Sequence, residues 1–285
     1  MVRSLSLAWS AAALVLPAAV AAQSFSFAYQ PQVGTFSSLV HEVRGTVHYM
    51  GIPSLPDSVT AEYEAQVGET RRFVEQLAGA WIAHQTFDSV RARYRVQERQ
   101  WRSIASRTTA LQPIRMLVDD RGVGSPMGET PVEEAAIARG VSSGLQLQLP
   151  DAPVSPGDSW SAALRVPVIM PVAGDSARII AVNLDGAGEA TLDSLVARTS
   201  DTLAYVSVRG RLQPVVVNTV HPLNGTPATI EIWGSTLSSM IWSTGWGSWV
   251  SGGSSLLIRG RLEMPSGPAD GHILADLTSR FQIRP

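Results

Sequence analysis

Apolar and polar residues alternate with a period of two along most of this chain. The clearest case is residues 59–67, where valine, alanine and tyrosine occupy the odd positions and threonine, glutamate and glutamine the even ones. Successive side chains of a strand point to opposite faces, so this pattern predicts a sheet with one apolar and one wetted face. Weaker alternation at 25–29, 38–50, 202–210 and 255–264 predicts further strands.

Residues 71–90 fit two patterns. Phe73, Leu77 and Trp81 share one face of a helix, but the same segment also fits two strands that turn at Ala78-Gly79. We favour the hairpin, because the neighbouring segments alternate as strands do and glycine suits a tight turn.

Two other segments are predicted to be short helices. Residues 91–112 hold six arginines against one acid, Glu98, and suit an amphipathic helix with a solvated basic face. The alternative is a basic face that binds anions or a membrane surface. Residues 131–139 begin with a proline and contain two early glutamates, and Gly140 follows them. Proline and acidic residues favour the first turn of a helix, and glycine favours its C-terminal end.

The most distinctive segment is 145–160. It begins as an alternating strand, contains three prolines within 150–159 and ends at a tryptophan. Proline lacks a backbone donor, so these residues are not expected to form an interior strand. We expect Asp158 to accept backbone hydrogen bonds in a turn, and Trp160 to fill the core where the next strand begins.

These features predict a mainly β fold. We expect curved antiparallel sheets, arranged as a half-open barrel or a sandwich, with one to three short helices. The expected organisation is a single β-rich domain over 23–285, made of two halves at about 23–149 and 160–285. The proline-rich segment 150–159 joins the two halves.

The first 22 residues have the pattern of a secretory signal peptide. Arg3 precedes an apolar run at 5–20, and small residues favour cleavage before Gln23. A membrane anchor is the alternative, but the run is short and Pro17 interrupts it. We therefore expect a periplasmic or secreted protein whose mature part has no transmembrane span.

Composition narrows the expected functions. The chain has no cysteine, which predicts no disulfide, no thiolate metal site and no cysteine to carry a lipoprotein anchor. All 22 basic residues are arginines, yet the formal net charge is −2. This charge argues against a nucleic-acid partner.

No pattern predicts a catalytic, metal-binding or cofactor-binding residue. The histidines lie at positions 41, 48, 84, 221 and 272. They lack the spacing of a zinc site and are expected to be isolated surface or loop residues, with His41 and His48 on opposite faces of a strand. Gly140-Val-Ser-Ser-Gly144 has the letters of a hydrolase elbow, but a helix is expected before it and a strand after it, which is the reverse order. Carboxylates show no pairing in the sequence, so a glycan hydrolase stays open as an alternative.

Residues 230–253 have an unusual composition, with four of the eight tryptophans and a single charge, Glu231. Tryptophan among glycine and serine suits an aromatic lid over an apolar or glycan ligand, or a loop that touches a membrane. The alternative is a pair of core strands with glycine-rich turns. The candidate ligand-binding residues are Trp233, Trp242, Trp246 and Trp249.

The central segment also carries a family resemblance. Pro150-Asp-Ala-Pro-Val-Ser-Pro-Gly-Asp-Ser-Trp160 resembles the P-x-x-P-V-x-x-G-D-S-W motif of exported bacterial β-rich proteins of unknown function. The resemblance implies a periplasmic or secreted β protein, and it transfers no catalytic residue.

Three functions are therefore weighed. The first is a non-enzymatic protein of the cell envelope that binds a lipophilic ligand or an envelope component, because a curved sheet with an apolar concave face suits an apolar ligand. The second is a structural or protein-interaction module without a small-molecule site. The third is a glycan hydrolase that uses unidentified carboxylates.

Overall fold

The computed structural model describes residues 24–52, 58–107, 112–120, 122, 124–128, 138, 141, 145–172, 178–220, 227–264 and 267–284. The strands are β1 (Phe36–Met50), β2 (Ser58–Leu77), β3 (Ala80–Val96), β4 (Arg102–Arg107), β5 (Ile114–Asp119), β6 (Gly124–Pro126), β7 (Gln146–Leu147), β8 (Ser159–Val172), β9 (Arg178–Ala197), β10 (Thr202–Val220), β11 (Pro227–Ser243), β12 (Ser248–Met264) and β13 (Gly267–Arg284).

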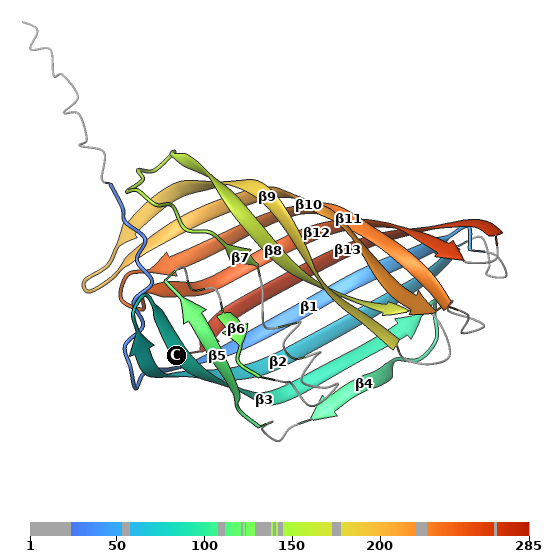
Figure 1. Ribbon diagram of the computed structural model, residues 1–285, viewed down its shortest axis with the longest axis horizontal. Coiled ribbons are helices and arrows are strands. Elements are labelled where there is room, and N and C mark those ends of the chain that lie inside the picture. Colours follow the sequence, from blue (N-terminus) through green and yellow to red (C-terminus); the bar gives the residue numbers. More distant parts are fainter. Residues whose placement is uncertain are drawn as a thin grey trace, which may run out of the picture.

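All these strands belong to one antiparallel sheet. Their order is β6-β5-β3-β2-β1-β13-β12-β11-β10-β9-β8-β7, and β4 pairs with β3 beside β5. The sheet is strongly curled (Figure 1), so that β8 contacts β1 and β2 across the hollow. The prediction of a mainly β fold with curved antiparallel strands in a half-open barrel is confirmed.

Strand β2 shows how the alternating pattern builds this sheet. Its odd positions from 59 to 67 are buried and its even positions are half-buried or exposed, as the sequence predicts. On the convex face, the carboxylates of Glu62 and Glu64 pair with Arg95 and Arg93 of β3 at 2.8 and 2.6 Å. Apolar side chains therefore cover the concave face, while cross-strand ion pairs occupy the convex face.

Glycines allow the sheet to curl tightly on its concave side. Gly188 of β9 and Gly210 of β10 are paired across the two strands, and Leu164 of β8 packs over both. A Cβ atom on Gly210 would overlap the Cδ1 atom of Leu164, and one on Gly188 would lie 2.8 Å from it. The missing side chains thus let a leucine from the third strand approach the backbone closely.

The two interpretations of residues 71–90 are resolved in favour of the hairpin. Strands β2 and β3 pair up to Leu77 and Ala80, and Gly79 adopts a positive φ of 73° in the turn between them. Glycine adopts this backbone conformation without steric cost, which explains its place there.

The helix predicted for 91–112 is wrong. Strand β3 extends to Val96, and after a turn β4 returns along it. The arginines of β3 alternate with the buried Ala92 and Tyr94, a period of two rather than 3.6. Arg93 and Arg95 stack on Trp101 at 4.6 and 5.1 Å from its ring centre, in addition to their ion pairs with β2. Glutamates of the neighbouring strand, which the local sequence does not reveal, thus explain the positions of Arg93 and Arg95.

The second helix predicted, 131–139, and the loop at 140–144 lie almost entirely outside the described residues. Two residues of this region, Ala138 and Val141, are described, and both are helical and buried. Ala138 agrees with the predicted helix, whereas the helical state of Val141 differs from the loop predicted after Gly140. They pack in a cluster with apolar residues of β2 and β3, among them Val67, Phe87 and Val90. They therefore cover part of the concave face.

The central proline-rich segment runs along the edge of the sheet between β7 and β8. The Asp158 carboxylate accepts a hydrogen bond from the backbone N–H of Ser155 at 2.7 Å, and Gly157 has a φ of 94°. The predicted turn role of Asp158 is confirmed. Trp160 is half-buried rather than fully enclosed, and its indole N–H donates to the carbonyl of Gln148 at 3.0 Å. It caps the edge of the core instead of filling its centre.

A membrane-crossing helix is not among these elements: within the described ranges, no helix has the length and apolar character to span a bilayer.

Candidate functional site

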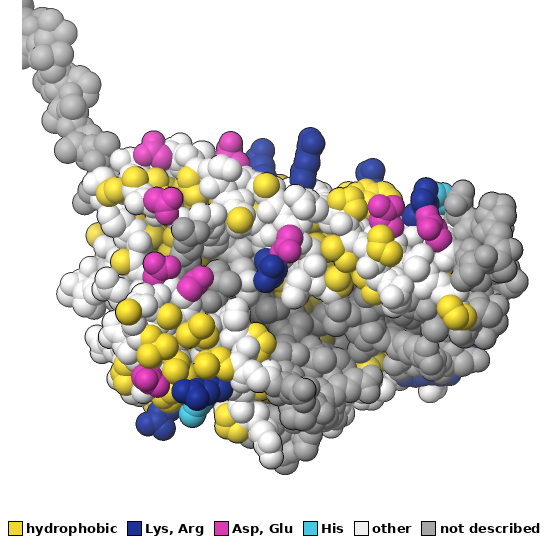
Figure 2. Space-filling view, viewed as in Figure 1, with side chains coloured by type: hydrophobic (Ala, Val, Ile, Leu, Met, Phe, Trp, Pro, Cys, Tyr) yellow, Lys and Arg dark blue, Asp and Glu magenta, His cyan; other side chains and the backbone are white. Residues whose placement is uncertain are grey.

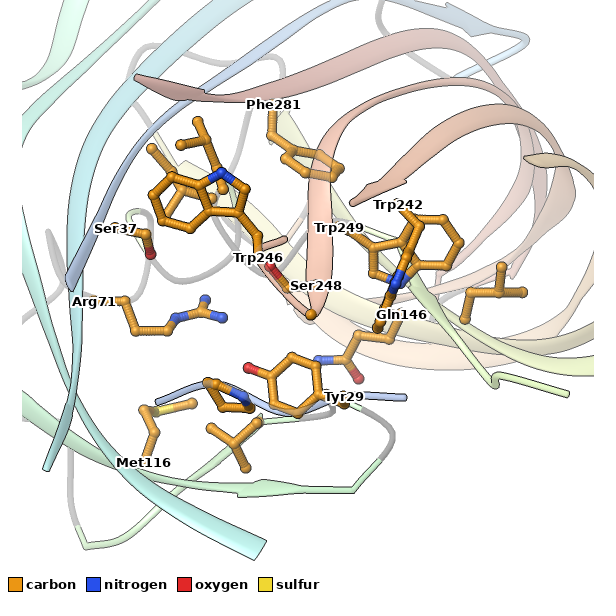
Figure 3. Close-up of a pocket in the computed structure, with 18 of the residues that line it drawn as sticks. Tyr29, Ser37, Arg71, Met116, Gln146, Trp242, Trp246, Ser248, Trp249 and Phe281 are labelled. Atoms are coloured by element: carbon orange, nitrogen blue, oxygen red, sulfur yellow. The ribbon is translucent and has the colours of Figure 1, made fainter. Parts of the chain in front are cut away.

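The concave face of the sheet surrounds a cavity of about 820 Å³ (Figure 3). Its walls come from the first residues of β1, from β2, β3 and β5 on one side, and from β8, β9, the β11–β12 turn and the end of β13 on the other. Ligand pockets in proteins commonly measure about 300–1,000 Å³. This cavity is therefore large enough for a small organic ligand.

An aromatic N-terminal segment crosses the hollow. Residues 25–29 were expected to form a strand, but Phe25 makes an isolated bridge with Val154, and the residues after it pair with no strand. Phe27 instead packs on three tryptophans, with ring centres 5.5 Å from Trp242, 5.7 Å from Trp160 and 6.0 Å from Trp249. The aromatic residues of this segment therefore insert into the concave face, although the segment itself is not a strand of the sheet.

The four candidate tryptophans have different environments. Trp242 and Trp249 line the cavity and pack edge to face with ring centres 5.2 Å apart, and Trp242 is only 1% exposed. Trp246 lies in the β11–β12 turn, lines the cavity and is 47% exposed. Trp233 is half-buried on the convex face, where it pairs with Arg259. Three of the four thus line one cavity, and Trp233 does not. A role of the three in ligand binding stays a prediction.

Asp201 fixes the turn that carries Trp246. Its carboxylate accepts hydrogen bonds from the hydroxyls of Ser243 and Thr244 and from the backbone N–H of Gly245, at 2.7–2.9 Å. Burial alone would raise the pKa of Asp201, but these hydrogen bonds outweigh it and lower the pKa. The anchored turn therefore holds the indole of Trp246 at the cavity.

A buried ionic cluster forms one wall of the cavity, and the sequence analysis did not identify it. The Glu69 carboxylate, with a side chain that is 0% exposed, accepts hydrogen bonds from His41 Nε2 at 2.9 Å and from Arg71 Nε at 3.1 Å. A second Arg71 nitrogen lies 2.9 Å from the same Glu69 oxygen, and Gln85 also hydrogen bonds to Glu69. Arg71 in turn hydrogen bonds to Tyr29.

The strand register places this cluster on the concave face. Glu69 and Arg71 continue the odd positions of β2, which are the buried ones, and His41 continues the odd positions of β1. Extending the alternation of 59–67 by two more odd residues would have shown two charges on an apolar face. The sequence therefore contains a signal for this cluster, although composition and spacing alone do not reveal it.

The cluster keeps Glu69 ionised. Burial alone would raise the pKa of Glu69, but the charge of Arg71, followed by His41 and Gln85, outweighs burial and holds the pKa at about 2. An ionised carboxylate only accepts hydrogen bonds, so His41 Nε2 carries the proton of the bond between them. Burial also raises the pKa of Tyr29, against the influence of Arg71.

The depressed pKa predicts acid sensitivity. Because the pKa of Glu69 falls from 4.5 to about 2 on folding, its ionised form stabilises the protein fully above about pH 4.5. We expect roughly 3 kcal/mol of this stability to be lost as pH falls from about 4.5 to about 2. Urea unfolding of the natural protein and of Glu69→Gln at several pH values measures this loss. If the free energies of unfolding of the natural protein and of Glu69→Gln change by the same amount between about pH 4.5 and about pH 2, the prediction is wrong.

The prediction of isolated surface or loop histidines is wrong for His41, which is 4% exposed and paired with Glu69. His48 is half-buried, and its Nδ1 atom lies 3.0 Å from the hydroxyl of Thr60. The two side chains do lie on opposite faces of β1, as predicted. His84 and His272 are exposed, while His221 lies outside the described residues. In the part of the chain that the structure describes, no group of three His, Asp or Glu residues could hold a metal ion.

The chain was compared with known proteins: it matches no family model and no curated protein. The resemblance to exported β-rich proteins is therefore carried by the central motif alone and stays a prediction.

Proposed function

We propose that this chain is an exported protein of the cell envelope that binds a lipophilic molecule in the cavity of its concave face, and that it is not an enzyme. The observation that carries the proposal is the cavity of about 820 Å³, into which aromatic residues from distant parts of the chain converge. The signal-like pattern of residues 1–22 supports export.

The wall of the cavity contains polar and apolar side chains, and its apolar part favours a lipophilic ligand. Besides the tryptophans, the wall contains Phe73, Leu147, Val168, Met240 and Phe281. A ligand that covers such side chains gains roughly 25 cal/mol for each Å² of apolar surface removed from water. Aspartate and glutamate are absent from the described residues that line the cavity. A pair of carboxylates, which a glycan hydrolase requires, is thus not found on this described wall, and the observation favours binding.

Binding of N-phenyl-1-naphthylamine, an uncharged apolar fluorophore, tests the proposal. We expect saturable binding with one site per chain, together with energy transfer from the tryptophans that line the cavity. Adjacent serines of β1 provide matched variants, because Ser37 lines the cavity and Ser38 lies on the other face of the strand. Ser37→Trp should weaken binding roughly tenfold or more by occupying the cavity, whereas Ser38→Trp should leave it unchanged.

Two outcomes would overturn this proposal. One is a folded natural protein that does not bind the fluorophore, which would favour the interaction-module alternative. The other is an unchanged affinity in folded Ser37→Trp, which would place the binding outside the cavity.

A further inference from the structure

The cavity differs in charge from the rest of the molecule. Apart from His41, its charged residues within the described part of the wall are two arginines, Arg71 and Arg165. The whole chain, in contrast, has 24 acidic and 22 basic residues. On the face shown in Figure 2, acidic and basic side chains are scattered without a large area of one sign. The charged groups on the described wall of the cavity are therefore cationic, while the carboxylates that pair with them, Glu69 and Asp185, do not line it.

Arg71 presents part of its guanidinium to this cavity. Its Nε and one terminal nitrogen bond to the Glu69 carboxylate, which is itself 0% exposed and does not line the cavity, while the Arg71 side chain is 26% exposed. A guanidinium has five N–H donors in a planar fork, so donors remain after the contacts with Glu69 and Tyr29. Figure 3 shows the Arg71 side chain reaching toward the middle of the cavity, among Ser37, Tyr29 and Ser248.

The buried carboxylate orients Arg71 without covering it. One oxygen of the Glu69 carboxylate accepts a hydrogen bond from Arg71 and the other accepts one from His41. Gln85 also forms a hydrogen bond with Glu69. Arg165 differs, since it forms two hydrogen bonds with the exposed Asp185 and its own side chain is 51% exposed. Arg71 is thus the pre-oriented cation inside the cavity, and Arg165 lies at its rim.

Apolar groups lie on the opposite side of the same cavity. Trp242 and Trp249 come from the β11–β12 hairpin, and Figure 3 places them across the cavity from Arg71. Phe281 of β13 adds a further aromatic ring, which stacks on His41 with ring centres 6.1 Å apart. One cavity therefore offers an oriented cation at one side and an aromatic wall at the other. This arrangement is complementary to a molecule with an anionic head and an apolar tail.

We infer that the ligand is a single-chain amphiphile whose anionic oxygen headgroup, a carboxylate or a phosphate, pairs with Arg71 while its tail lies against the aromatic wall. The inference rests on the proposed function and deepens it by naming the class of ligand.

Four ligands with the same twelve-carbon tail test the inference by displacement of N-phenyl-1-naphthylamine at about pH 8, where a carboxylate is ionised. They are dodecanoate, dodecyl phosphate, dodecanol and dodecyltrimethylammonium. We expect at least one anionic ligand to bind about ten- to a hundredfold more tightly than dodecanol, as charge-assisted hydrogen bonds imply, and the cation to bind most weakly. The comparison of dodecanoate with dodecyl phosphate identifies which head the site prefers.

The same panel separates the two proposals. If no ligand displaces the fluorophore and the fluorophore itself does not bind, the proposed function fails and this inference fails with it. If dodecanol binds as tightly as both anionic ligands, the proposal of a lipophilic site is retained, but the inferred preference for an anionic headgroup is wrong.

A pair of variants assigns the preference to Arg71. Arg71→Met alone leaves Glu69 buried without its cation, so the double variant Glu69→Gln/Arg71→Met is used. The control is Glu64→Gln/Arg93→Met, which removes an ion pair of the same two residue types on the convex face, outside the cavity. The first double variant should lose the ten- to hundredfold preference for the anionic ligand over dodecanol, whereas the control should keep it. A folded Glu69→Gln/Arg71→Met variant that retains the preference overturns the role of Arg71.

Discussion

Replacement of Trp242 by alanine should lower the free energy of unfolding by about 3–5 kcal/mol. The indole is 1% exposed and packs edge to face on Trp249, Phe27 and Tyr29, with ring centres 5.2, 5.5 and 6.5 Å away. Its removal would leave a hole that these aromatic neighbours cannot fill, and the N-terminal segment would lose its principal contact. Urea unfolding followed by far-ultraviolet circular dichroism measures the effect.

Trp246 provides the control for this prediction. It lies four residues after Trp242, in the turn that follows β11, but it is 47% exposed, so Trp246→Ala should cost about 1 kcal/mol or less. Because both changes remove one tryptophan, the pair separates burial from residue type. Equal unfolding midpoints for the two variants would show that Trp242 does not contribute to the core as described.

The second large effect concerns the buried ion pair. Arg71→Met should destabilise the protein by about 3–5 kcal/mol, because it leaves the fully buried Glu69 carboxylate without its strongest partner. The double variant Glu69→Gln/Arg71→Met should recover most of this loss, since a neutral amide can still accept the hydrogen bond from His41. Chemical unfolding of both variants near neutral pH measures the coupling.

The comparison of the single and double variants shows whether the loss of stability comes from an unpaired charge or from lost packing. If the double variant is as unstable as Arg71→Met, the loss comes from the packing of the arginine stem rather than from an unpaired charge. An unchanged stability of Arg71→Met would contradict the buried pair itself and would weaken the acid-sensitivity prediction for Glu69. These measurements need no ligand and are therefore independent of the proposed function.

Local pattern predicted the strands more reliably than the helices. The alternation at 59–67 identified both the strand and its buried face, and the turn at Ala78-Gly79 followed from its residues. The arginine-rich segment 91–112 was assigned to a helix because basic residues with apolar neighbours suit an amphipathic helix. Its arginines are explained instead by glutamates of β2 and by Trp101, which are distant or across a turn.

The site was only partly predictable for a similar reason. Composition drew attention to Trp242, Trp246 and Trp249, which do meet at the cavity, but it could not separate them from Trp233 on the convex face. The Glu69–Arg71 pair carried a usable signal, because both residues continue the buried positions of β2. His41 could not be paired with Glu69 from the sequence, since their contact depends on the register between β1 and β2.

The sequence by itself determined the period of the clearest strands, such as β2, the face that they bury, and the turn between β2 and β3. These properties depend on neighbouring residues, which the sequence displays directly. The tertiary structure alone decided that β1 pairs with β13, that the sheet curls until β8 contacts β1 and β2, and that a cavity forms between them. Backbone hydrogen bonds between strands are nearly the same for every residue type, so strand order is set by packing over the whole chain.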